Sequence, residues 1–418
     1  MTQNNKPLRI GYIIFALGAL FYAYEYFLRI APSVMHPQIV QAFHLNATDF
    51  GMLSAFYFYA YTPMQLVVGV LIDRYNARKI IMIAILACAA GSFMIAATDS
   101  YTLACIGRFL QGFGSAFAFV GGLKLTSMWL PKERFASYAG LVNMLGFLGA
   151  GIGTITMSYL VTSLGWRDTI QYFAVLGIVL SLGFWITTRK APKSQHHAHT
   201  KAKDFKTAGK QLWALVKMPR VWLAGIFAGL MFLPTTVFAA LWGVPYLEKF
   251  HHYPAHQAAF AVAMIFIGWA IGTAITGWLS DTLKTRTKLM RFGALGAAIL
   301  AILLLYIVQL PYAVICILFI LFGILSSVEA LAFIVAVDLA PSHSAIATAV
   351  AFINTLTMIG GMIFQRGLGQ MLDLFWSGHM SSHGIRIYSV LDYEKAVTII
   401  PISLVVAFVI ALFIRDSI

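Results

Sequence analysis

Long apolar segments, separated by shorter polar ones, recur along the whole chain. A helix needs about 20 predominantly apolar residues to cross a bilayer, and twelve segments meet that requirement. They lie at 10–31, 49–72, 79–98, 102–129, 136–160, 168–188, 220–246, 257–280, 289–309, 311–339, 344–373 and 395–414. The pattern predicts an all-α polytopic membrane protein with twelve transmembrane helices.

The second half of the pattern repeats the first. A Gly-x-x-x-Asp sequence closes the second span and again the eighth, and later glycines and asparagines recur at a similar separation of about 210 residues. The repeated pairs are Gly69 and Gly277, Asp73 and Asp281, Gly112 and Gly323, and Asn143 and Asn354. We therefore predict two pseudo-symmetric six-helix bundles, an architecture typical of alternating-access transporters.

A basic, polar segment separates the two repeats. It defines an N-terminal bundle over 1–188, a cytoplasmic linker over 189–219 and a C-terminal bundle over 220–418. An amphipathic stretch near 206–216 predicts a short helix on the membrane surface. The linker also carries the histidines at 196, 197 and 199, but this setting is typical of a solvated linker, so we predict no metal site.

Composition supports the membrane assignment. The chain is 60% hydrophobic and 11% charged, whereas soluble proteins carry about 25% charged residues. The net charge of +14 could suggest a nucleic-acid partner, but most of the 29 Lys and Arg residues fall in loops on one side. By the positive-inside rule both termini are cytoplasmic, and the basic surface faces anionic lipid. We expect an inner-membrane protein with no nucleic-acid partner.

The first span contains an acid and a base. Glu25 and Arg29 are four residues apart and can pair on one helix face, and each charge costs about 2.5–3.5 kcal/mol at the bilayer centre. Glu25 is thus a proton-carrier candidate, and Arg29 could hold a substrate carboxylate. The alternative is a permanent pair that only shapes the bundle. Tyr22 and Tyr26 flank the pair and could stack on a substrate.

Other polar residues within the spans are further candidates. Arg108 and Gln111 share a face of the fourth span and could bind a carboxylate, although Arg108 could instead lie on backbone carbonyls. Glu329 in the tenth span is the second proton-site candidate, with a hydrogen bond to a neighbouring helix as its structural alternative. The remaining substrate-binding candidates are Asn143, Asn354 and Trp242.

The sequence contains no phosphate-binding glycine loop and no nucleophile–base or metal constellation. We therefore expect no cofactor and no enzyme activity, and an ion gradient would have to supply the energy.

Three motifs make the whole chain resemble the major facilitator superfamily. The segment 69–79 resembles the family's loop 2–3 signature, 108–112 its fourth-span motif, and 129–134 its loop 4–5 pattern. The resemblance implies that Asp73 caps the eleventh span and latches the halves in the outward-open state, with Arg74 and Arg78 as charge partners. It also implies gating roles for the motif residues Gly69, Asp281 and Arg134, and a monomer.

Within that family, residues 24–35 and 53–65 resemble the proteobacterial Pht branch of amino-acid uptake proteins. This resemblance implies proton-coupled symport of a small polar solute such as an amino acid. Siderophore transport, efflux of drugs or metabolites, and a non-transporting nutrient receptor are the alternatives.

Overall fold

A computed structural model describes residues 6–130, 135–189, 205–307 and 310–416. Within these residues, 12 helices are long and apolar enough to cross a membrane, and each lies close to a predicted segment. The structure therefore confirms the prediction of an all-α protein with twelve transmembrane helices.

Several of the twelve spans consist of more than one helical element. In the first half the elements are α1 (Lys6–Val34), α2 (His36–Phe43), α3 (Ala47–Arg74), α4 (Ala77–Ala97), α5 (Tyr101–Ser115), α6 (Ala118–Trp129), α7 (Phe135–Leu164) and α8 (Trp166–Arg189). The second half comprises α10 (Pro219–Leu233), η3 (Pro234–Trp242), α11 (Gly243–Phe250), α12 (Ala255–Leu283), α13 (Thr287–Tyr306), α14 (Tyr312–Ser326), η4 (Ser327–Glu329), α15 (Ala330–Asp338), η5 (His343–Ala345), α16 (Ile346–Phe375), α17 (Val390–Val397) and α18 (Ile399–Phe413). Between the halves lies α9 (Phe205–Val216), where the sequence predicts a short amphipathic helix.

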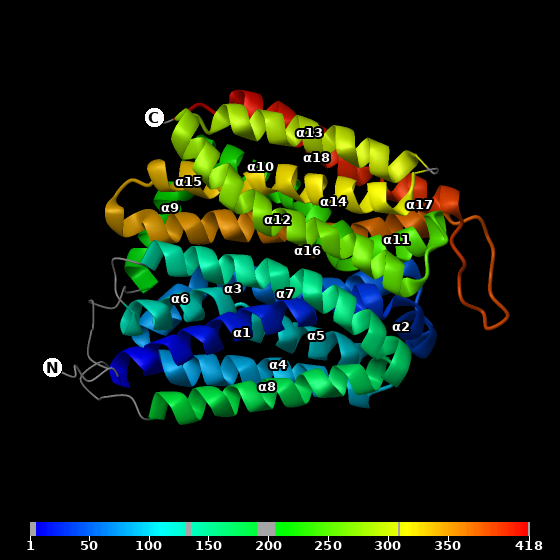
Figure 1. Ribbon diagram of the computed structural model, residues 1–418, viewed down its shortest axis with the longest axis horizontal. Helices are drawn as coiled ribbons and strands as arrows, with labels where there is room; N and C mark the ends of the chain where they lie inside the picture. The colour runs from blue at the N-terminus through cyan, green and yellow to red at the C-terminus, as the bar shows by residue number, and fades with distance from the viewer. Residues whose placement is uncertain (1–5, 131–134, 190–204, 308–309, 417–418) are drawn as a thin grey trace.

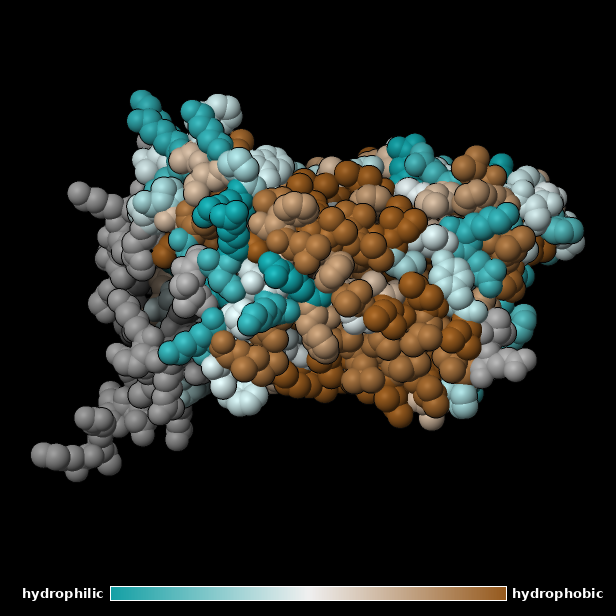
Figure 2. Space-filling model, turned by 90° about the horizontal axis from the view of Figure 1, so that it is seen from above, coloured by the Kyte–Doolittle hydropathy of each residue, from teal (hydrophilic) through white to brown (hydrophobic). Residues whose placement is uncertain are grey.

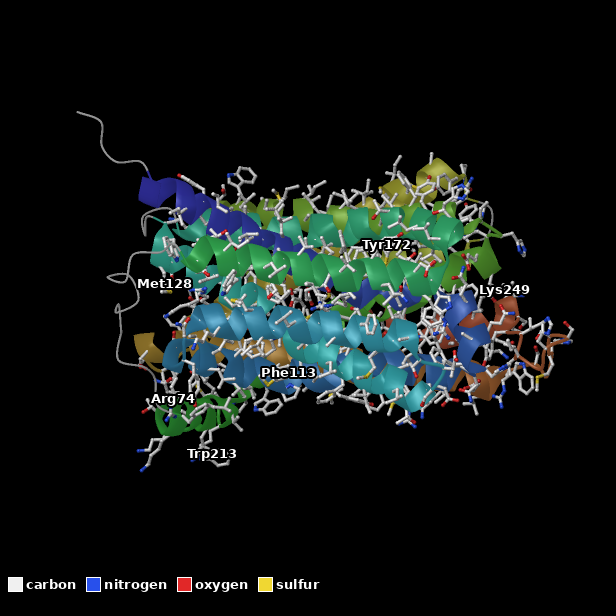
Figure 3. The ribbon with its side chains drawn as sticks, turned by 90° about the horizontal axis from the view of Figure 1, so that it is seen from below. Arg74, Phe113, Met128, Tyr172, Trp213 and Lys249 are labelled. Atoms are coloured by element: carbon white, nitrogen blue, oxygen red, sulfur yellow. The ribbon has the colours of Figure 1, made fainter. Side chains whose placement is uncertain are left out.

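The two halves form two helical bundles that pack side by side, with the helices roughly parallel to one long axis (Figure 1). Both chain termini and α9 lie at one end, which we call the termini end; α2, α11 and α17 lie at the other, which we call the far end. On the face shown in Figure 2, apolar residues cover the middle of the molecule and polar residues gather toward both ends. Arg74 and Trp213 mark the termini end and Lys249 the far end (Figure 3). This surface is that of a protein embedded across a bilayer.

Repeated glycines bring helices into close contact at equivalent places in the two halves. A Cβ at Gly112 would overlap the carbonyl oxygen of Tyr57, so α5 packs directly on the backbone of α3. In the second half, a Cβ at Gly323 would overlap the carbonyl oxygen of Ile265, so α14 packs on α12 in the same way. Small residues at such crossings are typical of membrane helix bundles.

Within the described residues four spans are interrupted, none of which is predicted from the sequence, and one of them is the twelfth, which breaks between α17 and α18. The fourth span breaks after Ser115, and the tenth breaks after Ser326 into the short 3-10 helix η4. The seventh widens into the π-helix η3, which begins at Pro234, a residue that cannot donate the regular helical hydrogen bond. Such interruptions free backbone groups from the regular ladder and often lie at functional sites.

The two halves touch at the far end and separate at the termini end. Near the far end α3 crosses α16 closely, since a Cβ at Gly51 would overlap the carbonyl oxygen of Gln365 and one at Gly369 that of Ala47. Near the termini end, a Cβ at Gly69 of α3 would meet no atom within 4 Å. The same helix pair is therefore closed at one end and open at the other.

Candidate functional site

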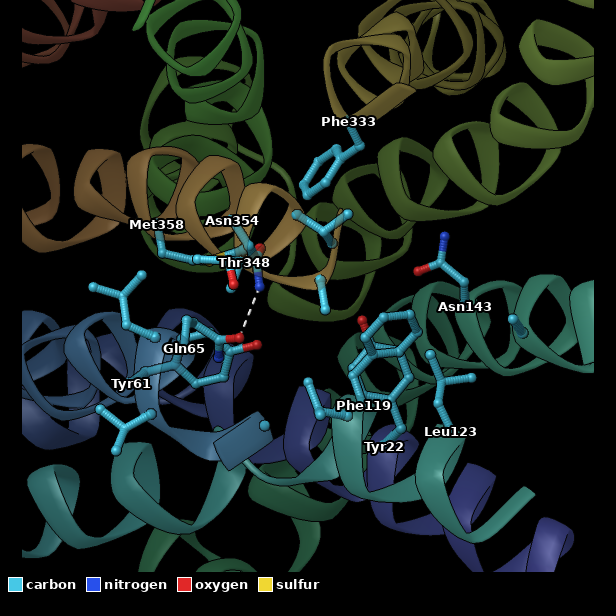
Figure 4. Close-up of a pocket in the computed structure, with 18 of the residues that line it drawn as sticks. Tyr22, Tyr61, Gln65, Phe119, Leu123, Asn143, Phe333, Thr348, Asn354 and Met358 are labelled. Carbon is cyan, nitrogen blue, oxygen red and sulfur yellow. Dashed lines mark hydrogen bonds between the residues drawn. The ribbon is translucent and has the colours of Figure 1, made fainter. Parts of the chain in front are cut away.

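A cavity of about 910 Å³ lies between the two halves. Its walls come from α1, α3, α6 and α7 of the first half and from α10, α12, η4, α15 and α16 of the second, and α9 borders it at the termini end. Gln65, Asn143 and Asn354 lie around a common space, together with the rings of Tyr22, Phe119 and Phe333 (Figure 4). The site is an aromatic chamber with a few polar groups, in the middle of a membrane-embedded bundle.

Glu25 and Arg29 form the ion pair that their spacing predicts. An Arg29 nitrogen donates to Glu25 Oε1, and the Tyr57 hydroxyl donates to the same oxygen at 2.5 Å. Arg29 also lies over the rings of Tyr26 and Tyr61, with its guanidinium carbon 4.7 and 4.9 Å from their centroids. Arg29 lines the cavity, whereas Glu25 is fully buried behind it and is not part of the cavity wall. The acid of the pair thus serves to hold Arg29 in place in this conformation.

Glu329 is in a different environment from Glu25. It ends η4, where the tenth span is interrupted, and it lines the cavity with 3% of its surface exposed. Its hydrogen bond comes from the Thr357 hydroxyl at 3.3 Å. Within the described residues Glu329 forms no ion pair. A carboxyl without a cationic partner in an apolar chamber is well suited to carry a proton.

Arg108 and Gln111 lie outside the cavity in this conformation. Arg108 donates to the backbone oxygen of Leu28 at 2.7 Å and to Gln111 Oε1 at 2.8 Å. Gln111 in turn donates to the Ser92 hydroxyl at 2.8 Å. Arg108 also lies over the Tyr57 ring, 5.0 Å from its centroid, so it shares Tyr57 with the pair of Glu25 and Arg29. This arrangement matches the structural alternative for Arg108, an arginine held by backbone carbonyls.

The two repeated asparagines both line the cavity, Asn143 from α7 and Asn354 from α16. The Asn354 amide donates to Gln65 Oε1 at 2.8 Å and so joins the second half to the first across the chamber (Figure 4). Gln65 is not among the site residues predicted from the sequence. Its position eight residues before Asp73 puts both on one face of α3, which is the signal that could have identified it.

The aromatic candidates divide between the cavity and the far end. Tyr22 and Tyr26 line the cavity and lie edge to face, with ring centroids 5.2 Å apart. Trp242 does not line the cavity. It is fully buried toward the far end, where its ring contacts Phe50 and its indole nitrogen donates to the Gln365 backbone oxygen at 3.0 Å. In this conformation Trp242 helps to close the far end.

The motif residues lie at the termini end. Gly69 and Asp73 line the cavity, and Asp73 pairs with Lys124 Nζ at 2.6 Å, so the cap of Asp73 on the eleventh span is not formed here. Arg74 lies over the Phe205 ring of α9 at 5.8 Å, and Arg78 donates to the Trp185 backbone oxygen at 3.2 Å. Of the other motif residues, Asp281 is exposed, and Arg134 lies outside the described residues.

The candidates therefore form two groups. One lines the cavity and comprises Tyr22, Tyr26, Arg29, Gly69, Asp73, Asn143, Glu329 and Asn354. The other, which comprises Glu25, Arg108, Gln111 and Trp242, packs behind the cavity or beyond it. A guanidinium group, that of Arg29, and a carboxyl group, that of Glu329, thus come from different halves to one chamber. Such a chamber can hold a small solute and a proton together.

Comparison with known proteins identifies a matching family and related transporters. The profile of the Major Facilitator Superfamily matches residues 6–365. The uncharacterized transporter YybO of Bacillus subtilis is 28% identical, over 91% of this chain and 92% of the relative. The probable sulfoacetate transporter SauU of Cupriavidus necator is 22% identical, over 88% of this chain and 89% of the relative.

Among solved structures, a bacterial homologue of the human lysosomal transporter Spinster, in an inward-facing and occupied conformation, superposes with a TM-score of 0.78 at 16% identity. The alignment covers 96% of each chain. At that identity the likeness shows a shared fold.

Proposed function

Because this chain belongs to the Major Facilitator Superfamily and is a multi-pass membrane transporter of that type, we propose that it takes up a small carboxylate-bearing solute together with protons. The solute class we favour is the amino acids, as in the Pht branch that the sequence resembles. The observation that carries this proposal is the cavity between the halves, which has Arg29 in one wall and Glu329 in the other.

Charge and helix packing support the proposed location and identify which side the described conformation opens to. The basic linker and both termini indicate that the termini end is cytoplasmic, in the inner membrane of a bacterium. Because the cavity borders α9 and Asp73 at that end while α3 and α16 meet at the far end, the described conformation is inward-open. Rocking of the two halves about the cavity would then expose the same residues to the outside.

Arg29 is the proposed carboxylate anchor. Arg108 was its equal on sequence, but Arg108 lies behind the Tyr57 ring and donates to backbone and side-chain oxygens. Arg29 lies in the cavity wall between two tyrosine rings, and a guanidinium there can donate two parallel hydrogen bonds to a carboxylate. Glu25 keeps this cation oriented and partly neutralised until the substrate arrives.

Glu329 is the proposed proton carrier, in preference to Glu25. A coupling acid must be free to bind and release a proton during the cycle, whereas Glu25 is held in an ion pair with Arg29 and accepts a hydrogen bond from Tyr57. Glu329 contacts the chamber directly and forms no ion pair among the described residues. Protonation from outside, binding of the carboxylate-bearing solute and release of both inside would give symport.

A second candidate substrate is an organic acid without an amino group. The similarity to a probable sulfoacetate transporter favours it, and Arg29 would serve such an anion equally well. Siderophore transport, efflux and a receptor role remain the weaker alternatives, since no described feature favours any of them over uptake.

The test is uptake of radiolabelled solutes into proteoliposomes with an imposed inward proton gradient. Two mixtures would be compared, one of amino acids and one of short organic acids, each with and without a protonophore. We expect one mixture to accumulate in a protonophore-sensitive way and Arg29→Lys to weaken its uptake. Failure of both mixtures, with protein shown to be folded and correctly oriented, would contradict the proposal.

A further inference from the structure

We propose that Asp373 is a latch that holds the far end closed, and that it alternates with the Asp73 contact of the termini end. The inference rests on the proposed function, because it requires two conformations with opposite ends open. It is based on a cluster in which side chains of the second half accept hydrogen bonds from the first backbone N–H groups of α3, a helix of the first half.

The cluster surrounds the first residues of α3. The backbone nitrogen of Thr48 donates to Asp373 Oδ2 at 2.8 Å, and the Thr48 hydroxyl donates to the same oxygen. The backbone nitrogen of Ala47 donates to the Tyr388 hydroxyl at 2.9 Å. The first backbone N–H groups of a helix have no partner within the helix. Here two of them are satisfied by side chains from the other half of the protein.

The second half holds Asp373 in position for this contact. The Tyr388 hydroxyl donates to Asp373 Oδ1, and Arg386 donates to the same oxygen at 3.0 Å. Arg386 lies over the Trp376 ring at 4.5 Å. These residues belong to the segment between α16 and α17, so this segment together with the end of α16 presents a fixed carboxylate to α3.

Helix electrostatics explain why the acid is placed there. Asp373 lies in the last turn of α16, where the partial negative charge of the helix end disfavours a carboxylate. Arg386 offsets part of that cost within the second half, and the positive end of α3 adds to this only while the far end is closed. Opening would transfer Asp373 and the N–H groups of Ala47 and Thr48 to water, with loss of a charge-assisted contact.

At the termini end the two main parts of a corresponding contact lie apart, and Asp73 pairs there with Lys124 of its own half. Asp73 lies in the last turn of α3, and α16 begins nearby without a side-chain cap, since its first flanking residue is Ala345. Asp73 and Thr348 of the first turn of α16 line opposite walls of the open cavity. Each helix of the pair therefore carries an acid in its last turn, at the end of the molecule where the other helix begins. Rigid helices that rock about their crossing can form one contact or the other but not both.

The test is the labelling rate of a buried cysteine at the far end. Ser54 is fully buried on α3, between Gly51 and Phe58, which both pack on α16, and Ser54→Cys is nearly isosteric. In a Cys316→Ala background its reaction with a maleimide requires opening of the far end. Asp373→Asn and Tyr388→Phe would each be combined with this reporter.

A matched control is Asp99→Asn. Asp99 pairs with Arg167 at the same end of the protein, but both residues belong to the first half, and Asp99 is highly exposed. Loss of a hydrogen bond to a charged group is expected to raise the labelling rate of the Asp373→Asn protein about tenfold. We expect a smaller rise for Tyr388→Phe and none for Asp99→Asn. Asp73→Asn should lower the rate, because it weakens the contact that holds the far end open.

The other outcomes contradict either the latch or the alternation between two conformations. Labelling that is measurable but equal in the wild type and the Asp373 and Tyr388 variants would overturn the latch and leave the proposed transport intact. An equal rise in the Asp99→Asn control would assign the effect to general loosening and would also overturn it. No labelling of Ser54→Cys in any variant would contradict alternation itself. The assay needs no substrate, so it stands apart from the uptake experiment.

Discussion

Replacing Glu25 and Glu329 by glutamine, one at a time, separates an acid that stabilises the fold from one that carries the proton. Glu25→Gln leaves Arg29, which is 2% exposed, without its carboxylate, and loss of one partner of a buried pair costs about 3–5 kcal/mol. Glu329→Gln should change the stability little, because the Thr357 hydroxyl, which donates to Glu329 at 3.3 Å, can donate equally to the amide oxygen of a glutamine. We expect that change to cost about 1 kcal/mol or less.

Two measurements on each variant test this prediction. Unfolding in detergent micelles should give a clearly lower free energy of unfolding for Glu25→Gln and a nearly unchanged one for Glu329→Gln. In proteoliposomes, one proton per solute and a gradient of about 2 pH units can drive roughly 100-fold accumulation, because each pH unit is worth about 1.36 kcal/mol. Glu329→Gln should reduce accumulation to about onefold and leave exchange of solute for solute intact.

Either of two results would contradict these roles of Glu25 and Glu329. If Glu329→Gln still accumulates solute against its gradient, Glu329 is not the coupling site. If Glu25→Gln is as stable as the wild type, the pair does not hold Arg29 in place. Glu329→Asp serves as the matched control, because it keeps an ionisable group at this position.

Three further predictions concern packing, capping and the contact across the cavity. Gly112→Val should abolish folded protein, measured by size-exclusion chromatography, since even a Cβ at this position overlaps the Tyr57 carbonyl oxygen. Asp416 accepts hydrogen bonds at the start of α13, so Asp416→Ala should lower stability by about 1 kcal/mol. Partial burial raises the pKa of Asp416, but the hydrogen bonds from the residues at the start of α13 outweigh this effect and hold the pKa below its ordinary value. The loss of stability in Asp416→Ala should therefore be complete at a pH above the ordinary pKa of an aspartate. It should disappear as the pH falls through the lowered pKa of the folded protein. Gln65→Leu removes the bond from Asn354, and the apparent affinity for substrate in uptake assays should change while the melting temperature stays within a few degrees of wild type.

The spans could be predicted from the sequence because the bilayer imposes their length and apolar character. The pseudo-symmetry was also visible, since glycines at helix crossings such as Gly112 and Gly323 have to recur where the same close contact recurs. The helix breaks were not predicted. The interruption at Ser327–Glu329 contains no proline or glycine, and its residues pack on the neighbouring helices α12 and α13.

The candidate site was predictable only in part. Intramembrane charges are costly enough to mark Glu25, Arg29, Arg108 and Glu329 as candidates, but their cost does not reveal which face the cavity. That depends on the partner each finds in three dimensions, such as Tyr57 for Glu25. Gln65 and the far-end residues around Asp373 were not predicted. An uncharged amide within a span and an acid at the end of a helix are common in sequences, and only their contacts in the structure distinguish them.

The central claim is that a solute and a proton move inward together through the cavity between the halves. The most direct test is to record the external pH of weakly buffered proteoliposomes when the solute identified by uptake is added without any imposed gradient. We predict that the external medium becomes more alkaline with the wild-type protein, in proportion to solute entry, and that Glu329→Gln abolishes the change. Solute entry without a change in external pH, in wild-type protein with a tight membrane, would contradict proton coupling.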